Sequence, residues 1–248
     1  MAAAGRKPGL LWPTIASAVA LAVLLGLGTW QVQRLQWKNS LIAQIAERTH
    51  ASPLPLADAL AAVRRGDDLE YSRVAVTGRW VPGVERYLWA PSSSGSGWHV
   101  YAPLKTQAGP VVIVNRGLVD DAHRDPATRP EPSQSSDVSL IGLLRMPEHK
   151  NAFTPDNDVA RNVWYWRDVD GMARSMFPVA EASTVAPFAL DAEAGGPPPP
   201  APQGGVTRLN IPNSHLQYAA TWYGLAATLV GVYVAFAWSR LQRGRENA

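Results

Sequence analysis

The chain has 248 residues, a net charge of +3 and no cysteine. The absence of cysteine excludes disulfides, thiolate catalysis, zinc sites of the Cys type and c-type haem attachment. Because the basic residues are spread thinly, with no basic stripe interleaved with aromatic residues, nucleic acid is not an expected partner. Ten tryptophans is a high number, and a location at a membrane surface would account for several of them.

Residues 10–33 carry no charge and follow Arg6 and Lys7. Their apolar core has about 21 residues, enough for a helix to cross the ~30 Å hydrocarbon core of a bilayer. A cleaved signal peptide is the alternative, but its apolar region would span only about 7–15 residues before a cleavage site of small residues. We therefore expect a retained transmembrane helix over residues 10–33, with the helix continuing to about Pro53.

Four aromatic or polar residues lie at the end of this first span: Trp30, Gln31, Arg34 and Trp37. One interpretation is an aromatic belt with snorkelling cations at a membrane surface. The other is that Trp30, Gln31 and Arg34 face the second helix and that Trp30, Gln31 and Trp37 form an interface. The two interpretations are compatible, because both helices meet the same membrane surface.

From residue 72 onward, apolar and polar residues alternate with the two-residue period of β-strands. The run 110–119 is the most apolar and is expected at the centre of a sheet. Several short strands joined by hairpins predict an antiparallel sheet that curls towards a barrel. The Pro-rich segment 195–205 is expected to be an extended, exposed loop. The expected strands are residues 72–80, 86–90, 98–106, 110–119, 138–145, 188–190 and 206–209, and the expected helices are 56–64 and 168–176.

No arrangement of side chains typical of an enzyme is found. None of the five histidines has another at the i,i+4 spacing, and no His-Glu-x-x-His, Gly-x-Ser-x-Gly or phosphate-loop sequence occurs. The sequence Asn115-Arg116-Gly117 leaves two interpretations open, a turn at the end of a strand or an anion site at Arg116. None of these classes of enzyme is therefore expected.

The second uncharged span opens at His215, and a transmembrane helix is expected over residues 215–239. A lone histidine at a membrane surface is more often a polar belt residue than a ligand. The neighbouring Ala219 and Trp222 favour a ligand, because a planar macrocycle needs an axial nitrogen, a gap and a stacking surface. At helical spacing one face carries His215, Tyr218, Ala219, Trp222, Ala226 and Leu229.

Two crossings place the tails, residues 1–9 and 240–248, on one side of the membrane and the domain of residues 34–214 on the other. The tails are basic, so the positive-inside rule puts them in the cytoplasm, whereas Arg34 and Lys38 argue weakly the other way. The expected fold is membrane α+β, with two transmembrane helices flanking an antiparallel β-rich, barrel-like extramembrane domain.

Three stretches of sequence resemble the Surfeit-locus protein 1 family, whose members are assembly factors for haem-copper cytochrome c oxidase. They read GTWQVQRLQWK, VIVNRG and NSHLQYAATWYGLA. The resemblance implies a role in maturing the haem a3 and CuB centre of oxidase subunit I. The family resembles a chaperone more than an enzyme, so the resemblance also implies that this protein is not an enzyme and has no catalytic residue. Bacterial members look like haem a binders with a histidine at the start of the second helix, which is His215 here, and the motif tryptophan is Trp222. It also implies a bacterial inner membrane location with a periplasmic main domain.

Two hypotheses follow. In the first, the protein carries haem a with His215 as the axial ligand of the iron, lined by Tyr218, Ala219 and Trp222, while Arg34 pairs with a haem propionate. Its expected partners are the lipid bilayer, oxidase subunit I and haem a synthase. In the second, the protein is a cofactor-free membrane scaffold that stabilises an assembly intermediate of subunit I, and His215 is a belt residue.

Overall fold

The computed structural model describes residues 9–92, 95–107, 109–129, 137–207, 209 and 211–246. The chain divides into two compact units. One, which we call the helix pair, contains residues Met1–Gln44 and Asn210–Ala248, and the other, the barrel domain, contains Ile45–Leu209.

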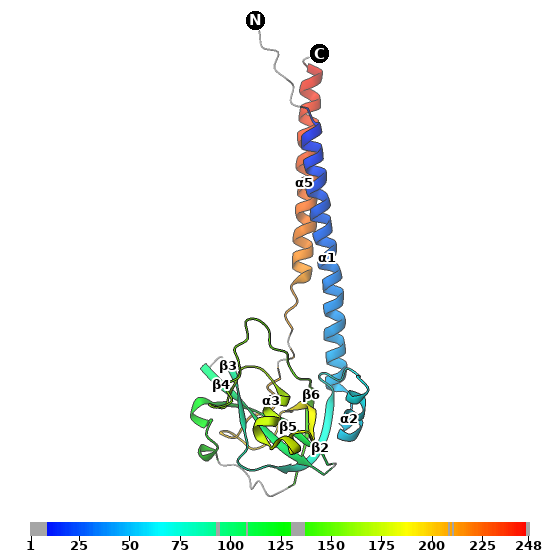
Figure 1. The fold of residues 1–248 in the computed structure, drawn as a ribbon. Coiled ribbons are helices and arrows are strands. Elements are labelled where there is room, and N and C mark those ends of the chain that lie inside the picture. The colour runs from blue at the N-terminus through cyan, green and yellow to red at the C-terminus, as the bar shows by residue number, and fades with distance from the viewer. Residues whose placement is uncertain are drawn as a thin grey trace. The chain divides into compact units, whose positions relative to one another are not determined.

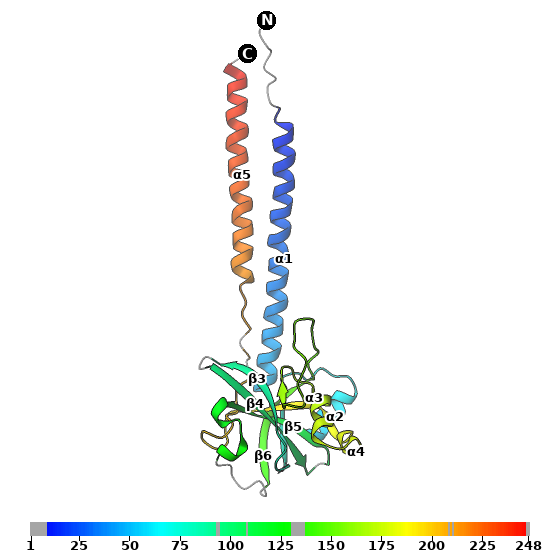
Figure 2. The same ribbon diagram turned by 60° about the vertical axis from the view of Figure 1, so that its left-hand side comes forward.

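The helix pair consists of α1 (Leu11–His50), apart from its last turns, and α5 (His215–Glu246). The two helices lie side by side and run antiparallel (Figures 1 and 2). Both are long and apolar enough to cross a membrane by length and composition. The α1 helix continues past the expected transmembrane span to His50, as the sequence indicated, and α5 continues past residue 239, beyond the expected helix.

The two helices bury a stripe of side chains with the spacing of a coiled coil. Residues that are partly or fully buried recur at alternating steps of three and four, which is the heptad pattern that keeps one face against a partner helix. We call this stripe the seam. In α1 it contains Ser17, Leu21, Leu24, Gly28, Gln31, Leu35 and Lys38, and in α5 His215, Ala219, Trp222, Ala226, Leu229, Tyr233 and Phe236.

The barrel domain is built on an eight-stranded sheet in the order β1-β2-β6-β8-β5-β4-β3-β7. An additional pairing between β2 and β4 closes strands β2, β6, β8, β5 and β4 into a barrel. The strands are β1 (Leu54–Pro55), β2 (Arg73–Trp80), β3 (Arg86–Ser92), β4 (Gly95–Thr106), β5 (Val111–Asp120), β6 (Val138–Arg145), β7 (Val163–Trp164) and β8 (Val185–Ala192). The domain also contains α2 (Leu56–Arg64), α3 (Val169–Met176), α4 (Val179–Ala182) and two 3-10 turns, η1 (Asp121–His123) and η2 (Pro126–Thr128).

Apolar residues on both faces of β5 explain its central position. Val112 and Val114 pack into one core cluster together with Leu56 of α2. Ile113, whose side chain points to the opposite face, packs into a second cluster with Met172 of α3. A strand covered on both faces is a continuous apolar run, as the sequence of β5 indicated.

Most of the expected elements are confirmed. The expected helix 56–64 and strand 138–145 are α2 and β6 with the same bounds. Asp168 caps α3 by accepting a hydrogen bond from the Gly171 amide at 2.8 Å. The barrel-like closure of the sheet is also confirmed.

Not every pair of strands is antiparallel. β5 and β8 run parallel, with Ile113 opposite Ala189 and Asn115 opposite Asp191. The connection between them passes through β6 and α3, which is long enough for the chain to return in the same direction. The short pairs β1–β2 and β3–β7 are parallel as well.

Two expectations about the end of the domain are wrong. Residues 206, 207 and 209 form no strand, and residue 208 lies outside the described residues. Here Thr207 donates a side-chain hydrogen bond to Asp191 at 2.9 Å instead of pairing along a ladder. The Pro-rich segment is not wholly exposed either, because Ala201 and Pro202 are buried.

Gly117 allows the Pro-rich segment to lie against β5. Asn115-Arg116-Gly117 is not a turn at a strand end, because β5 continues to Asp120 and its pairing with β4 shifts register at this point. Gly117 has a φ of 121°, a backbone conformation that residues other than glycine rarely adopt. A Cβ built there would lie 1.9 Å from the carbonyl oxygen of Gln203. Gln203 exchanges two backbone hydrogen bonds with Leu118, at 3.0 and 3.1 Å.

Gly117→Ala is expected to destabilise the protein by about 2–4 kcal/mol, since it combines backbone strain with a clash against backbone. Chemical unfolding of the detergent-solubilised protein, followed by tryptophan fluorescence, measures this change. Gly83→Ala is the matched control, because Gly83 has a φ of 71° but no neighbour within 4 Å. The control is expected to lose only about 1–2 kcal/mol. Equal losses in the two variants would contradict the role assigned to the Gln203 contact.

Candidate functional site

His215 is the first residue of α5, and its imidazole is held by α1. Its Nδ1 lies 2.7 Å from Oε1 of Gln31, whose side chain is almost fully buried. An amide oxygen can only accept, so this contact is a hydrogen bond when Nδ1 carries the proton, which in a neutral imidazole leaves the lone pair on Nε2. Within the part of the chain that the structure describes, Nε2 makes no hydrogen bond to protein.

The segment that enters α5 is tied to α1 by two further polar contacts. The Asn213 side-chain amide donates to the Asn39 amide oxygen at 2.9 Å, and the Lys38 ammonium donates to the carbonyl oxygen of Pro212. Together with the Gln31 contact they hold the start of α5 in place. His215 is therefore positioned by its own hydrogen bond and by the backbone that precedes it.

The helical face below His215 is packed against α1. Ala219 and Ala226 are 3% and 2% exposed, and Trp222 is half-buried. Small residues at such positions let two helices approach closely. The sequence predicted this face as a stacking surface for a macrocycle. Because α1 covers it, a planar group could lie on it only if α1 moved away.

Tyrosines on α5 continue the contact along the pair. A Cβ built on Gly28 would lie 2.9 Å from the ring of Tyr223, so a larger residue at this position would require the Tyr223 ring to move. The Tyr223 hydroxyl lies 3.2 Å from the Thr29 hydroxyl, and the Tyr233 hydroxyl lies 2.5 Å from that of Thr14. Polar contacts thus join the helices at both ends of the pair and in between.

The other expected site residues lie outside the seam. Tyr218, Trp30 and Trp37 are 54%, 54% and 51% exposed. Arg34 is exposed, and its guanidinium stacks over the Trp37 ring at 3.9 Å from the centroid. Of the three residues expected to face the second helix, the structure brings only Gln31 into contact with α5, because positions 30 and 34 fall to the side of the heptad stripe.

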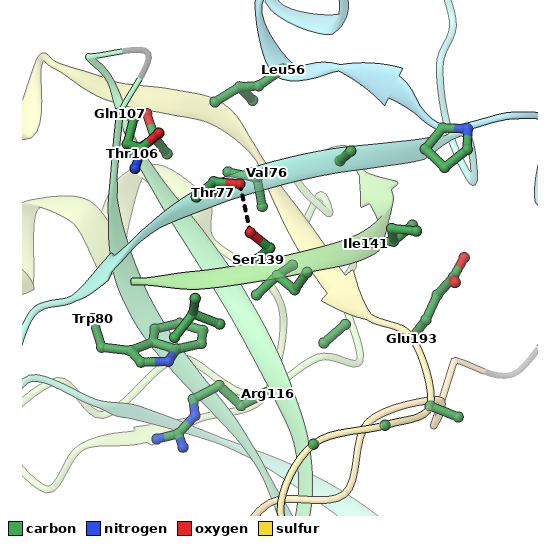
Figure 3. Close-up of a pocket in the computed structure, with 18 of the residues that line it drawn as sticks. Leu56, Val76, Thr77, Trp80, Thr106, Gln107, Arg116, Ser139, Ile141 and Glu193 are labelled. Atoms are coloured by element: carbon green, nitrogen blue, oxygen red, sulfur yellow. Dashed lines mark hydrogen bonds between the residues drawn. The ribbon is translucent and has the colours of Figure 1, made fainter. Parts of the chain in front are cut away.

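The barrel domain contains a cavity that the sequence did not indicate. Its volume is about 970 Å³, at the upper end of the range for small-molecule pockets. Figure 3 shows its floor, where the Thr77 and Ser139 hydroxyls are 2.9 Å apart on neighbouring strands, and Trp80 and Arg116 nearby. The Arg116 guanidinium lies 5.0 Å from the Trp80 ring centroid and pairs with Glu85 at 3.1 Å. The lining comes from segments far apart in the sequence, so no local pattern could have revealed it.

A buried carboxylate, Asp191, gathers donors from three segments of the barrel domain. It accepts from the Asn115 amide at 2.9 Å, the Arg145 guanidinium at 2.7 Å and the Thr207 hydroxyl at 2.9 Å. Burial, and after it the Asp191 charge, raise the pKa of the Tyr101 phenol well above its ordinary value. These groups line a small cavity of about 240 Å³, but the donors around Asp191 are already engaged with its carboxylate.

The described residues offer no conventional metal centre. No group of three or more histidine, cysteine, aspartate or glutamate side chains among them could hold an ion. His123, for example, pairs with Asp120 at 2.6 Å. The arrangement around His215 can supply a single imidazole nitrogen, which suits a metal whose other ligands come from elsewhere.

Most of the chain is similar in sequence to proteins of one known family. The model of the SURF1 family matches residues 18–227. The Surfeit locus protein 1 of Rattus norvegicus is 36% identical over 223 residues, covering 83% of this chain and 69% of the relative. The Homo sapiens protein of that name is 37% identical over 220 residues, covering 82% and 70%. A SURF1-like protein of Monosiga brevicollis is 35% identical over 246 residues, covering 94% and 89%.

The contact between Gln31 and His215 can be tested by cross-linking, because the native chain has no cysteine. In membranes, the double variant Gln31→Cys/His215→Cys is expected to be cross-linked efficiently by a short bismaleimide, since the two side chains meet across the seam. Electrophoretic mobility of the denatured protein measures the product. Gln33→Cys/His215→Cys is the matched control, because Gln33 is exposed on α1. Equal yields from the two pairs would contradict this face of α1 as the contact surface.

Proposed function

The chain belongs to the SURF1 family, and we propose that it is an assembly factor for haem-copper cytochrome c oxidase. In this proposal it binds haem a through His215 and aids insertion of the haem into subunit I, at the haem a3 and CuB centre. The observation that carries the proposal is the imidazole of His215, whose Nδ1 is held by Gln31 while Nε2 makes no hydrogen bond to the described residues.

Haem can be bound by a site that supplies only one protein ligand to the iron. A haem brings four equatorial nitrogens, so the protein has to add only an axial base, and neutral imidazole is a common one. The absence of a cluster of metal-binding side chains among the described residues is compatible with such cargo. A single protein ligand also favours release, which a carrier requires.

We propose the residues that would contact the haem ring from the exposure of their side chains. Tyr218 follows His215 by one helical turn and presents an exposed ring, and Arg34 makes no ion pair with the described residues. Arg34 is available to a haem propionate, because charge-assisted hydrogen bonds to carboxylates are among the stronger ones. Ala219 and Trp222 would act by packing α5 on α1, and would line the haem only where the helices part.

We further propose a location in a membrane, with α1 and α5 as transmembrane helices and the barrel domain on the side opposite the tails. The exposed rings of Trp30 and Trp37 would lie at the lipid surface. Subunit I of the oxidase and haem a synthase are the proposed partners. A bacterial inner membrane with a periplasmic barrel domain remains our proposal, since the relatives named above are eukaryotic.

The alternative function is a membrane scaffold that stabilises an assembly intermediate of subunit I without a cofactor. One observation favours it, namely that side chains of α1 and α5 pack directly against each other along the seam. In this case the Gln31–His215 hydrogen bond would only hold the helices together. Neither function requires a catalytic group, and we propose none.

His215→Ala is expected to abolish the haem absorbance of protein purified from cells that make haem a, because the axial nitrogen is lost. The variant should still accumulate in the membrane. His123→Ala is the matched control and should keep the wild-type Soret band, because His123 pairs with Asp120 on the barrel domain. Wild-type amounts of haem in His215→Ala would exclude ligation by this residue. A wild-type protein without haem under the same conditions would favour the scaffold.

Reporter fusions test the proposed placement in the membrane. An enzyme that is active only in the cytoplasm should work when it is fused after Ala248 and fail when inserted in the loop of residues 195–205. A reporter that requires the other compartment should show the opposite pattern. A C-terminal fusion active outside the cytoplasm would contradict the two-span arrangement with cytoplasmic tails.

A further inference from the structure

We propose that Gln31 is a positioning residue that selects the tautomer of His215 and so presents Nε2 as the metal-binding nitrogen. The inference extends the proposed function, since the metal would be the iron of the haem cargo. The selection of the tautomer itself is a property of the protein without haem. It can therefore be tested whether or not haem binds.

The geometry favours one tautomer of His215. The Gln31 amide oxygen lies 2.7 Å from Nδ1, and this contact is favourable only when Nδ1 carries the proton. In water, neutral imidazole prefers the proton on Nε2, the tautomer in which the outer nitrogen has no lone pair for a metal. Gln31 therefore acts against the intrinsic preference, and the hydrogen bond to one nitrogen determines which other nitrogen is available.

The burial of Gln31 makes the hydrogen bond hard to give up. The residue is 9% exposed and occupies a seam position between Gly28 and Leu35, where an apolar side chain would be expected. A buried amide without a partner costs free energy, so the carbonyl group stays on the imidazole. A polar residue in a seam can also simply fix the register of two helices, and the test has to separate these two roles.

The side chain that contacts Nδ1 of His215 is an uncharged amide, which suits a protein that must release its cargo. Histidines that bind metals usually donate their other N–H to a carboxylate or a carbonyl, which orients the ring and raises its basicity. A carboxylate would raise the basicity more than an amide does and would hold the iron more firmly. The amide of Gln31 orients the ring while leaving a ligand of ordinary strength, from which cargo can be passed on.

The first test uses haem-free protein in lipid nanodiscs with ¹⁵N-labelled histidine. The His215 signals, assigned by their loss in His215→Ala, should show a protonated Nδ1 and an unprotonated Nε2. In Gln31→Leu this preference should weaken or reverse. Gln33→Leu is the matched control, since Gln33 is exposed on the same helix, and it should leave the signals unchanged. A wild-type signal for protonated Nε2, or no change in Gln31→Leu, would overturn the proposal.

The second test adds haemin as the probe to the purified variants. Gln31→Leu should weaken haemin binding by about 10–100-fold, the usual effect of losing such a supporting hydrogen bond. Gln31→Glu should bind haemin at least as tightly as the wild type and shift the iron reduction potential to more negative values. A role in helix register alone predicts no such shift, so an unchanged potential in Gln31→Glu would overturn the proposal.

The two tests separate failure of this inference from failure of the proposed function. If the wild-type protein binds no haemin and no haem a, the proposed carrier function fails, and the nitrogen signals alone decide whether Gln31 selects the tautomer. If the wild type binds haemin and both Gln31 variants bind it identically, the carrier function stands and the role of Gln31 is refuted.

Discussion

The barrel domain depends on the satisfaction of one buried charge. Asp191 is almost inaccessible, and a carboxylate in that position is tolerated only when it is fully paired. Its partners Asn115, Arg145 and Thr207 belong to β5, β6 and the segment that leads out of the domain. The parallel pairing of β5 with β8 places Asn115 directly opposite Asp191. Closure of the barrel, the register of β8 and the course of the outgoing chain are therefore coupled at this carboxylate.

In the helix pair, hydrogen bonds between neutral side chains join separate segments, as the bonds to Asp191 do in the barrel domain. Gln31 is buried against His215, and tyrosine hydroxyls meet threonine hydroxyls further along the seam. These contacts join polar atoms of the two helices, while glycine and alanine permit the close approach. In our proposal the same hydrogen bond would also determine which nitrogen His215 presents, so that alignment of the helices and ligand chemistry would depend on a single contact.

The sequence predicted local structure well and pairing poorly, for physical reasons. Alternation of apolar residues indicated β2, and a continuous apolar run indicated the central strand β5, because both patterns are local properties of the sequence. The parallel β5–β8 pair and the absence of a strand at 206–209 depend on partners far away in the chain. The periodicity of α5 identified the face of Ala219 and Ala226 correctly, but periodicity shows only that a face is covered. Whether α1 or a ligand covers it depends on the heptad stripe of α1, in which Gln31 lies and Arg34 does not.

The closed seam and a haem-binding role are compatible in energy. Hydrogen bonds between side chains of membrane helices contribute on average only about 0.6 kcal/mol each, because the separated helices also find partners. The pairs Tyr223–Thr29 and Tyr233–Thr14 would therefore add only about 1 kcal/mol in total. Apolar packing adds less in lipid than in water, since the lipid chains replace the lost contacts. Parting α5 from α1 below His215, with the His215–Gln31 hydrogen bond kept, would thus cost little, and it would expose Ala219 and Trp222 to a bound group.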